Sequence, residues 1–402
     1  MTFAPRKVPE RPQPTLEVEV ERILPGGVGL AHAEGLTIFV SLAAPGDVVR
    51  VQIEKTRGKV AFATIKEIVK PSPVRIEPPC PYFGRCGGCD FQHLEYEAQL
   101  EAKVGIVQDC LHRIAGLADV PEIKIHPSPR SWHYRSRANW QFNQQTRALG
   151  YFERGTHRVC DVAECAVLVP ELQATLEKLR EEIRDNSLEI AVSDVDVVAG
   201  DNCVSVNPPC GEFSSHEVRR QVGNETYYFN PNAFFQTNHN LLEPLVDVAI
   251  GEMRGRTAID LYCGVGLFTL PLARRFEHVI GVESSRIAAR FAEQNLDNAG
   301  LLNAQIVTSR LADWLRQNSH AVSADFVLLD PPRTGAEAGV IEGVVGLRPQ
   351  HVSYVSCDPA TLARDLKVLL ARGYLLDSVA AFDMFPQTHH VETVVDLAAQ
   401  GL

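Results

Sequence analysis

TAIDLYCGVGLFT, residues 257–269, decides the fold, because an apolar strand here runs into a glycine turn that opens a helix. Gly264 and Gly266 let the backbone approach a ligand at that turn. The third glycine of the Gly-x-Gly-x-x-Gly dinucleotide fingerprint is missing, because position 269 is Thr269. The turn therefore disfavours NAD and favours another adenosine-containing cofactor.

The sequence around this turn alternates helices with apolar strands from residue 240 onward. The strands read HVIGVE, DFVLLD and HVSYVSC, and the pattern closes with VETVVDLA. Such alternation is typical of a doubly wound parallel sheet, which binds ligands at the carboxyl ends of its strands. We therefore expect a Rossmann-like α/β domain over residues 240–402.

Two carboxylates follow strands of this domain. Glu283 ends HVIGVE, 19 residues after Gly264, and can accept hydrogen bonds from ribose hydroxyls. Asp330 begins the Asp-Pro-Pro-Arg motif at residues 330–333, where two prolines keep the backbone extended and direct the carboxylate into the cleft. Taken alone, Asp330 could equally cap a turn.

A cysteine and a possible base follow later strands. Cys357 precedes Asp358, which suits a helix N-cap, and the positive end of that helix would lower the thiol pKa, although free cysteines are often inert core residues. Downstream, FPQTHHVE supplies His389, His390 and Glu392 as possible bases, and a His pair can also form part of a metal site.

The N-terminal region predicts a separate β-domain. Residues 1–14 hold four prolines and indicate a flexible tail. Residues 15–69 alternate apolar and polar positions between turns, which predicts an antiparallel barrel of about five strands. An OB-like nucleic-acid module and an unspecialised β-domain fit this pattern about equally.

Residues 70–239 predict a central α+β domain with helices at 96–117 and 170–184, the first of which could pack on the catalytic domain. Cys80, Cys86 and Cys89 lie on a Pro/Gly-rich loop that lets three thiols converge. Cys160 or Cys165 could supply a fourth ligand. The spacing suits an iron-sulfur cluster and a structural zinc equally.

Composition limits the class of protein. The chain has 402 residues, 10 cysteines and a net charge of -11, which argues against coating nucleic acid by bulk charge. No secretory signal or apolar run of membrane-spanning length is visible, so we expect a cytoplasmic protein with reduced thiols and no membrane partner.

Residues 121–160 are locally basic, with seven Lys and Arg against two Asp and Glu. Arginines and aromatic residues alternate over 130–158, which suggests phosphate contacts and base stacking, or else an ordinary sheet face.

Together these motifs resemble the RNA (uracil-5-)-methyltransferase family over nearly the whole chain. YVSCDPATLARD, FPQTHHVET, DLYCGVGLFTL and NPNAFFQTN are similar to its nucleophile, base, cofactor-loop and Phe-x-Gln-x-Asn motifs. Residues 15–69 resemble its RNA-binding TRAM module, and CPYFGRCGGC resembles the 4Fe-4S motif of its ribosomal RNA branch. Two departures stand out, since Asp358 replaces the usual Asn and the segment around Ala166 matches loosely.

The resemblance implies a role for each matching residue. It makes Cys357 the nucleophile and Glu392 the proton acceptor. It implies that S-adenosylmethionine is bound by Gln236, Tyr262, Glu283 and Asp330. It implies that a 4Fe-4S cluster is held by Cys80, Cys86, Cys89 and Cys165, with Cys160 as a bystander. An extra carboxylate at Asp358 would work against thiolate formation.

The implied activity is methylation of uridine C5 in RNA. A thiolate that adds at C6 activates C5 toward the methyl sulfonium, and a base then removes the C5 proton. Large-subunit (23S) ribosomal RNA is favoured over transfer RNA, because the transfer RNA branch resembles a shorter protein without the barrel or cysteine loop. An amino-methyltransferase, which needs no cysteine, and a non-catalytic RNA-binding iron-sulfur protein are the alternatives. No obligate protein partner is indicated.

Overall fold

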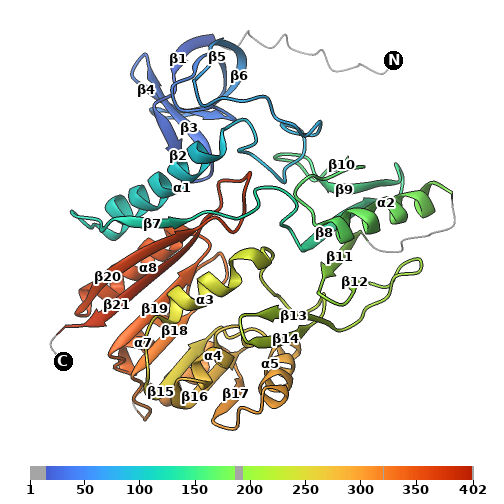
Figure 1. Cartoon of the computed structure of the whole chain (residues 1–402). Coiled ribbons are helices and arrows are strands. Elements are labelled where there is room, and N and C mark those ends of the chain that lie inside the picture. Colours follow the sequence, from blue (N-terminus) through green and yellow to red (C-terminus); the bar gives the residue numbers. More distant parts are fainter. Residues whose placement is uncertain (1–14, 186–192, 320, 401–402) are drawn as a thin grey trace, which may run out of the picture.

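The computed structural model describes residues 15–185, 193–319 and 321–400 (Figure 1). The predicted tail at residues 1–14 lies outside these ranges. Within them, no helix has both the length and the apolar character needed to cross a membrane. The described chain forms an N-terminal sheet, a smaller central sheet and a large C-terminal sheet flanked by helices (Figure 1).

The N-terminal sheet has six strands, in the order β1-β5-β6-β4-β3-β2. They are β1 (Thr15–Glu19), β2 (Arg22–Leu24), β3 (Val28–Ala33), β4 (Leu36–Ser41), β5 (Val48–Arg57) and β6 (Val60–Lys70). Alternate side chains, among them Ile38, Val40, Val49 and Val51, are buried in one core. The sequence predicts about five antiparallel strands, but the short β2 adds a sixth and β4 pairs with β6 in parallel. Period-two alternation marks strands but does not fix the direction of pairing.

The segment after the cysteine loop joins the C-terminal sheet. Helix α1 (Tyr96–Cys110) continues as a π-helix (Leu111–Ala115), which ends at Gly116 in the left-handed region with φ 79°. Its buried face packs in the same core as helix α8 (Pro359–Ala371). Strand β7 (Ile123–His126) then pairs in parallel with β20 (Tyr374–Phe382) at the edge of the C-terminal sheet.

The central sheet is antiparallel, in the order β10-β9-β8-β11-β12. Its strands are β8 (Arg137–Asn143), β9 (Ala148–Phe152), β10 (Val159–Asp161), β11 (Asp194–Ala199) and β12 (Val204–Asn207). Helix α2 (Pro170–Arg184), which the sequence predicts with these bounds, covers one face through Leu172, Leu176 and Leu179. A hairpin of β13 (Val218–Val222) and β14 (Glu225–Phe229) leads from this sheet to the C-terminal one (Figure 1).

The C-terminal sheet has the order β17-β16-β15-β18-β19-β21-β20-β7. Its other strands are β15 (Gly255–Leu261), β16 (Phe276–Glu283), β17 (Ala304–Thr308), β18 (Phe326–Leu329), β19 (His351–Ser356) and β21 (Glu392–Ala399). A 3-10 helix (His239–Leu241), α3 (Leu242–Ile250), α4 (Thr269–Ala273) and α5 (Arg286–Asn298) share one core, and α6 (Leu311–Asn318), α7 (Val340–Gly346) and α8 share the other. Helices therefore cover both faces, as in a doubly wound sheet.

The direction of β21 decides where the site lies. Strands β15, β16, β18 and β19 run parallel, so their carboxyl ends meet at one edge. Strand β21 runs antiparallel to β19, with Thr393 opposite Ser356. Its first residue, Glu392, therefore lies at the edge where the parallel strands end.

Candidate active site and cysteine site

A cavity of about 740 Å³ opens at this edge of the C-terminal sheet. All six residues that the sequence analysis assigns to catalysis and cofactor binding line it: Gln236, Tyr262, Glu283, Asp330, Cys357 and Glu392. They come from five different strand ends and from the segment before α3, so only the folded topology brings them together.

The glycine turn fixes the Glu283 carboxylate at the cavity wall. One carboxylate oxygen accepts a hydrogen bond from Gly264 N at 3.0 Å, and the other accepts one from Ser285 N at 2.6 Å. Tyr262 has a φ of 64° and Gly264 a φ of 55°, so two residues of the turn occupy the left-handed region. Such a conformation is costly for tyrosine, and it persists here because the surrounding contacts hold the turn.

Asp260 lies beneath the turn and is fully buried. It accepts a hydrogen bond from Thr269 Oγ1 at 2.5 Å, whereas its second carboxylate oxygen has no partner among the described residues. Burial raises its pKa to about 8, and the nearby Asp330 and Glu283 carboxylates add to the rise. The wall of the cavity is therefore rich in acidic groups, which suits a ligand that carries positive charge.

The segment that contains Gln236 is held by the first residues of the central sheet. The backbone N–H and the hydroxyl of Ser136 both donate to Thr237 O, at 2.9 and 2.8 Å. The guanidinium of Arg137 donates to Ala233 O at 2.8 Å and also to Pro231 O. The central sheet thus positions one wall of the cavity.

Cys357 lies between β19 and α8, as the sequence predicts. Asp358 is the N-cap of α8, and its carboxylate accepts hydrogen bonds from Ala360 N at 3.0 Å and Thr361 N at 2.9 Å. The expectation that the helix end lowers the thiol pKa is wrong for the free protein. Burial raises the pKa of Cys357 to about 12, Glu392, Asp330 and Asp358 add to the rise, and Arg333 opposes it.

Glu392 is almost completely buried, with 1% of its surface exposed. Its Oε1 atom has no hydrogen-bond partner among the described residues. Burial first, and then the Asp330 carboxylate, raises the pKa of Glu392 well above its ordinary value, while Arg333 opposes the rise. Burial likewise raises the pKa of Asp330 to about 7. An unpartnered carboxyl oxygen on a cavity wall is available to a ligand.

The two histidines before Glu392 do not line the cavity. His389 is bonded to Asp90, with His389 Nδ1 2.5 Å from the carboxylate. Burial, together with the charge of His389, lowers the pKa of His390 to about 3. Of the three possible bases in FPQTHHVE, Glu392 alone is among the residues that line this cavity.

Three further residues that line the cavity were not predicted as site residues from their motifs: Arg333, Phe234 and Arg137. Arg333 ends the Asp-Pro-Pro-Arg motif and opposes the pKa rise of both Cys357 and Glu392. Phe234 is 64% exposed, and Arg137 Cζ lies 6.0 Å from the centroid of its ring. Arg333 belongs to the Asp-Pro-Pro-Arg motif, Phe234 to NPNAFFQTN and Arg137 to the basic segment 121–160. These patterns alone do not show which of their side chains face a ligand.

The predicted arginine and aromatic surface is wrong for three of its aromatic residues. Tyr134, Trp140 and Phe142 are buried, because they lie on the side of the central sheet that α2 covers or in its contacts with the C-terminal part. Phe152 remains exposed, as do Arg130, Arg147 and Arg158, although Arg158 pairs with Glu153. These three aromatic residues therefore stabilise the core and are not available for base stacking.

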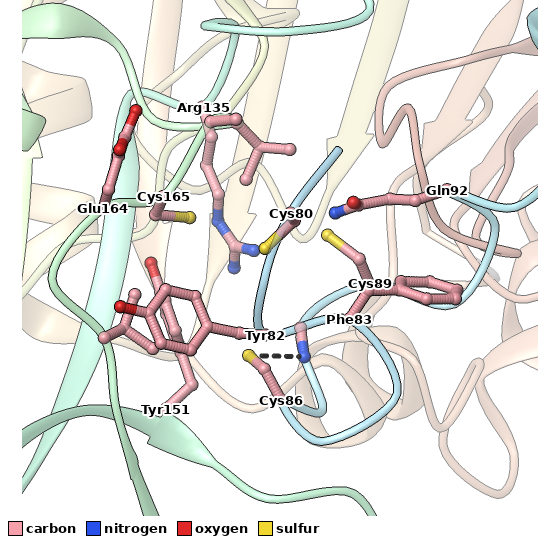
Figure 2. Close-up of a pocket in the computed structure, with 14 residues that line it drawn as sticks. Cys80, Tyr82, Phe83, Cys86, Cys89, Gln92, Arg135, Tyr151, Glu164 and Cys165 are labelled. Carbon is pink, nitrogen blue, oxygen red and sulfur yellow. Dashed lines mark hydrogen bonds between the residues drawn. The ribbon is translucent and has the colours of Figure 1, made fainter. Parts of the chain in front are cut away.

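A second, smaller cavity of about 30 Å³ is lined by Cys80, Cys86, Cys89 and Cys165. Figure 2 shows the four sulfur atoms directed toward the space between the loops. Cys160 does not line it and is fully buried in the core of the central sheet. Burial raises the pKa of Cys86 to about 11 and that of Cys89 to about 12.

These four thiols provide a donor set suited to iron-sulfur clusters, which are held by cysteine thiolates. In residues 15–185, 193–319 and 321–400, however, no three His, Cys, Asp or Glu side chains are close enough to hold a single metal ion. The structure thus brings the four predicted cysteines to one cavity but does not itself show a metal-binding group.

Comparison with known proteins places these features in a known group. Residues 212–400 match the family described as tRNA (Uracil-5-)-methyltransferase, and residues 13–66 match the TRAM domain. The chain is 34% identical to the 23S rRNA (uracil(1939)-C(5))-methyltransferase RlmD of Pectobacterium atrosepticum, over 95% of this chain and 93% of that protein. It is 32% identical to the Vibrio parahaemolyticus protein of the same name, over 98% of both chains.

A solved structure is also similar over nearly the whole chain. It is the Pyrococcus abyssi tRNA (uracil-54, C5)-methyltransferase in complex with S-adenosyl-L-homocysteine, with a TM-score of 0.73 and 27% identity over 95% of this chain and 100% of that one. The expectation that a transfer RNA enzyme would be shorter is therefore wrong for this relative. Length and overall arrangement do not separate the two kinds of RNA substrate.

Proposed function

This chain belongs to the RNA (uracil-5-)-methyltransferase family, and we propose that it methylates C5 of a uridine in large-subunit (23S) ribosomal RNA. One observation carries the chemistry: Cys357 and Glu392 line the same cavity as the four residues assigned to the methyl donor. The choice of ribosomal RNA is supported by the names of the two relatives that match at 34% and 32% identity.

The methyl donor in this proposal is S-adenosylmethionine, held by Gln236, Tyr262, Glu283 and Asp330. Glu283 accepts hydrogen bonds from the ribose hydroxyls. Two backbone N–H groups hold its carboxylate at the end of β16, and the carboxylate oxygens retain free lone pairs. The acidic wall formed by Asp330 and Asp260 suits a positively charged sulfonium. The complex of the P. abyssi relative with S-adenosyl-L-homocysteine supports this choice of methyl donor.

The reaction begins when the Cys357 thiol loses its proton to solvent and the resulting thiolate sulfur bonds to C6 of the uracil ring. The ring becomes an enolate, and C5 takes the methyl group from the sulfonium, which leaves as a neutral thioether. Glu392 then accepts the C5 proton, the C6–S bond breaks, and the thiolate returns. The target base must leave its stack to reach the cavity.

Two positive charges adjust the protonation of these groups. Both Cys357 and the carboxyl groups of Asp330 and Glu392 have raised pKa values in the free protein. Arg333 favours the ionised forms of Cys357 and Glu392. A sulfonium cation held by Asp330 would act in the same direction and so would favour ionisation of the nucleophile and the base together.

The cysteine site forms the second part of the proposal: Cys80, Cys86, Cys89 and Cys165 hold a 4Fe-4S cluster. Their shared cavity supports this set and leaves Cys160 outside it. Protein purified without oxygen should be brown and contain roughly four irons and four sulfides per chain. Stoichiometric zinc without acid-labile sulfide would contradict the proposal, and Cys160→Ala is the matched control that should leave the iron content unchanged.

The substrate is tested by mapping uridine methylation in a deletion strain. Loss of one methylated uridine from 23S ribosomal RNA, restored by the wild-type chain and not by Cys357→Ala, is the expected result. Loss from transfer RNA instead would favour the activity named for the P. abyssi relative. Full turnover by Cys357→Ala would favour an amino-methyltransferase, which needs no cysteine nucleophile.

A further inference from the structure

Arg135 lies in the wall between the two cavities. It lines the small cavity together with the four cysteines, and it also lines the large cavity that contains Cys357. Figure 2 shows its side chain reaching into the small cavity toward the sulfur atoms of Cys80 and Cys165. The mechanism proposed above does not use this residue.

The backbone of Arg135 is fixed from two sides. Its N–H donates to Val167 O at 2.8 Å, and its carbonyl accepts from Val169 N at 3.0 Å, so it is joined to the strand-like segment that follows Cys165. It also forms a β-bridge with Asn238, two residues after Gln236. Backbone contacts with the segment after Cys165 and with the segment that carries Gln236 therefore position the Arg135 guanidinium in the cysteine cavity.

The side chain has no acidic partner among the residues that the structure describes. Its Nε donates to Arg137 O at 3.0 Å, and its Cζ lies 5.9 Å from the centroid of the Tyr151 ring. Glu164 also lines the cavity, but Figure 2 shows its carboxylate pointing away from the sulfur atoms. By contrast, Arg85, which lies on the cysteine loop itself, and Arg158 both pair with Glu153.

A half-buried guanidinium without a carboxylate is costly unless another anion faces it. Four thiolates around a metal cluster give the site a net negative charge. Among the residues that line the cysteine cavity, Arg135 alone carries a positive charge; Arg154 donates to Cys89 O at 2.8 Å but does not line the cavity. We infer that Arg135 compensates the negative charge of the metal-loaded cysteine site. This inference rests on the proposed 4Fe-4S ligation.

Charge compensation has two measurable consequences. Nearby positive charge and N–H donors to sulfur raise the reduction potential of an iron-sulfur cluster. They also stabilise the ligated thiolates. Loss of a residue that contacts the ligands of a metal site typically lowers metal affinity roughly 10- to 100-fold. Removing the charge of Arg135 should therefore lower the midpoint potential and speed the loss of iron.

The test compares Arg135→Met, Arg135→Lys and Arg85→Met in the full chain purified without oxygen. Arg135→Met roughly keeps the side-chain volume but removes the charge, whereas Arg135→Lys keeps the charge. Arg85→Met is the control, because Arg85 is paired with Glu153 and does not line the cavity. We expect Arg135→Met to shift the midpoint potential negatively and release iron to a chelator roughly 10- to 100-fold faster. Arg135→Lys should restore much of both properties, and Arg85→Met should behave as the wild type.

Wild-type potential and iron-release rate in Arg135→Met would overturn the inference while leaving the cluster itself in place. A merely structural role would predict equal damage from Arg135→Lys and Arg135→Met, so that result would also overturn it. If Arg135→Met fails to fold, Arg135→Gln replaces it, since the amide keeps a donor and lacks the charge. A wild-type chain without iron or labile sulfide would instead defeat the proposed ligation.

Discussion

The carboxylate of Asp90 accepts a hydrogen bond from His389 N at 2.8 Å and lies 2.5 Å from His389 Nδ1. Asp90 directly follows Cys89, whereas His389 lies three residues before Glu392. Phe91 N and Asp90 N also donate to Gln387 O, at 3.0 Å each. The cysteine loop and the segment that carries the proposed base are therefore joined directly.

Replacing Asp90 should loosen this junction. Burial alone would raise the pKa of Asp90, but the hydrogen bond and charge of His389 and the charge of Arg154 outweigh burial and hold it below the ordinary value. The carboxylate therefore stabilises the fold above the ordinary Asp pKa, and this contribution is lost as the pH falls through the lowered pKa. Asp90→Asn should reduce the free energy of unfolding at pH 7 by about 1.5–3 kcal/mol.

Chemical denaturation at several pH values checks this expectation, with the exposed Asp119→Asn as the control. The stability difference between wild type and Asp90→Asn should shrink toward acid pH. A difference that stays constant down to the acid transition would contradict the assigned role of the Asp90 charge.

The sequence predicts the parts of the site that depend on strand ends. Glu283 ends a strand, and Asp330 and Cys357 each follow one. Because these three strands run parallel, the edge that the residues share can be inferred from the alternation of helices and strands. The N-cap at Asp358 and the bounds of α2 are likewise local features of the chain.

The remaining features depend on contacts between distant segments. Lys103 forms a fully buried ion pair with Asp383 and donates to Phe385 O at 3.0 Å, across 280 residues of sequence. Nothing in the helical spacing of α1 indicates that one lysine faces inward. Similarly, the alternation of apolar and polar residues places Trp140 on one face of a strand, but it does not show that this face is covered. The raised pKa of Cys357 also follows from burial, which the sequence does not reveal.

Glu283 offers a test of the cofactor site. Glu283→Ala should weaken binding of S-adenosylmethionine by about 1.5–3 kcal/mol, because a charged acceptor for the ribose hydroxyls is lost. Glu283→Gln keeps an acceptor oxygen for Gly264 N and should lose less. Calorimetry on both variants, with the exposed Glu293→Ala as control, measures the difference; equal affinity of Glu283→Ala and wild type would remove Glu283 from the ribose site.

Asp358 offers a test of how Cys357 is ionised. The Asp358 carboxylate contributes to the raised pKa of Cys357, after burial, Glu392 and Asp330. Asp358→Asn keeps an oxygen that can accept from Ala360 N and Thr361 N, so α8 should retain its cap. The thiol pKa should fall, since a like charge near the thiolate is gone.

The rate of covalent adduct formation with 5-fluorouridine RNA should therefore rise with pH in the wild type. In Asp358→Asn this rise should move to lower pH, with a rate at pH 7.5 roughly 2- to 10-fold higher. The exposed Asp377→Asn should leave the profile unchanged. An unaltered profile in Asp358→Asn would mean that another step, rather than thiol ionisation, limits the adduct.

The division of labour between Cys357 and Glu392 gives the most direct test of the mechanism. Before the thiolate adds, the C5 proton is not labile, so loss of the base should prevent neither attack on C6 nor transfer of the methyl group. Cys357→Ala should give no product and no adduct, whereas Glu392→Gln should methylate once and stall as a protein-RNA adduct that survives denaturing electrophoresis.

Cys203→Ala, at a half-buried thiol away from the cavity, is the matched control and should turn over normally. Because Glu392 lines the cavity and His389 and His390 do not, the same adduct should be absent from His389→Ala and His390→Ala. Accumulation of the adduct in either histidine variant, with normal turnover by Glu392→Gln, would transfer the role of base to that histidine.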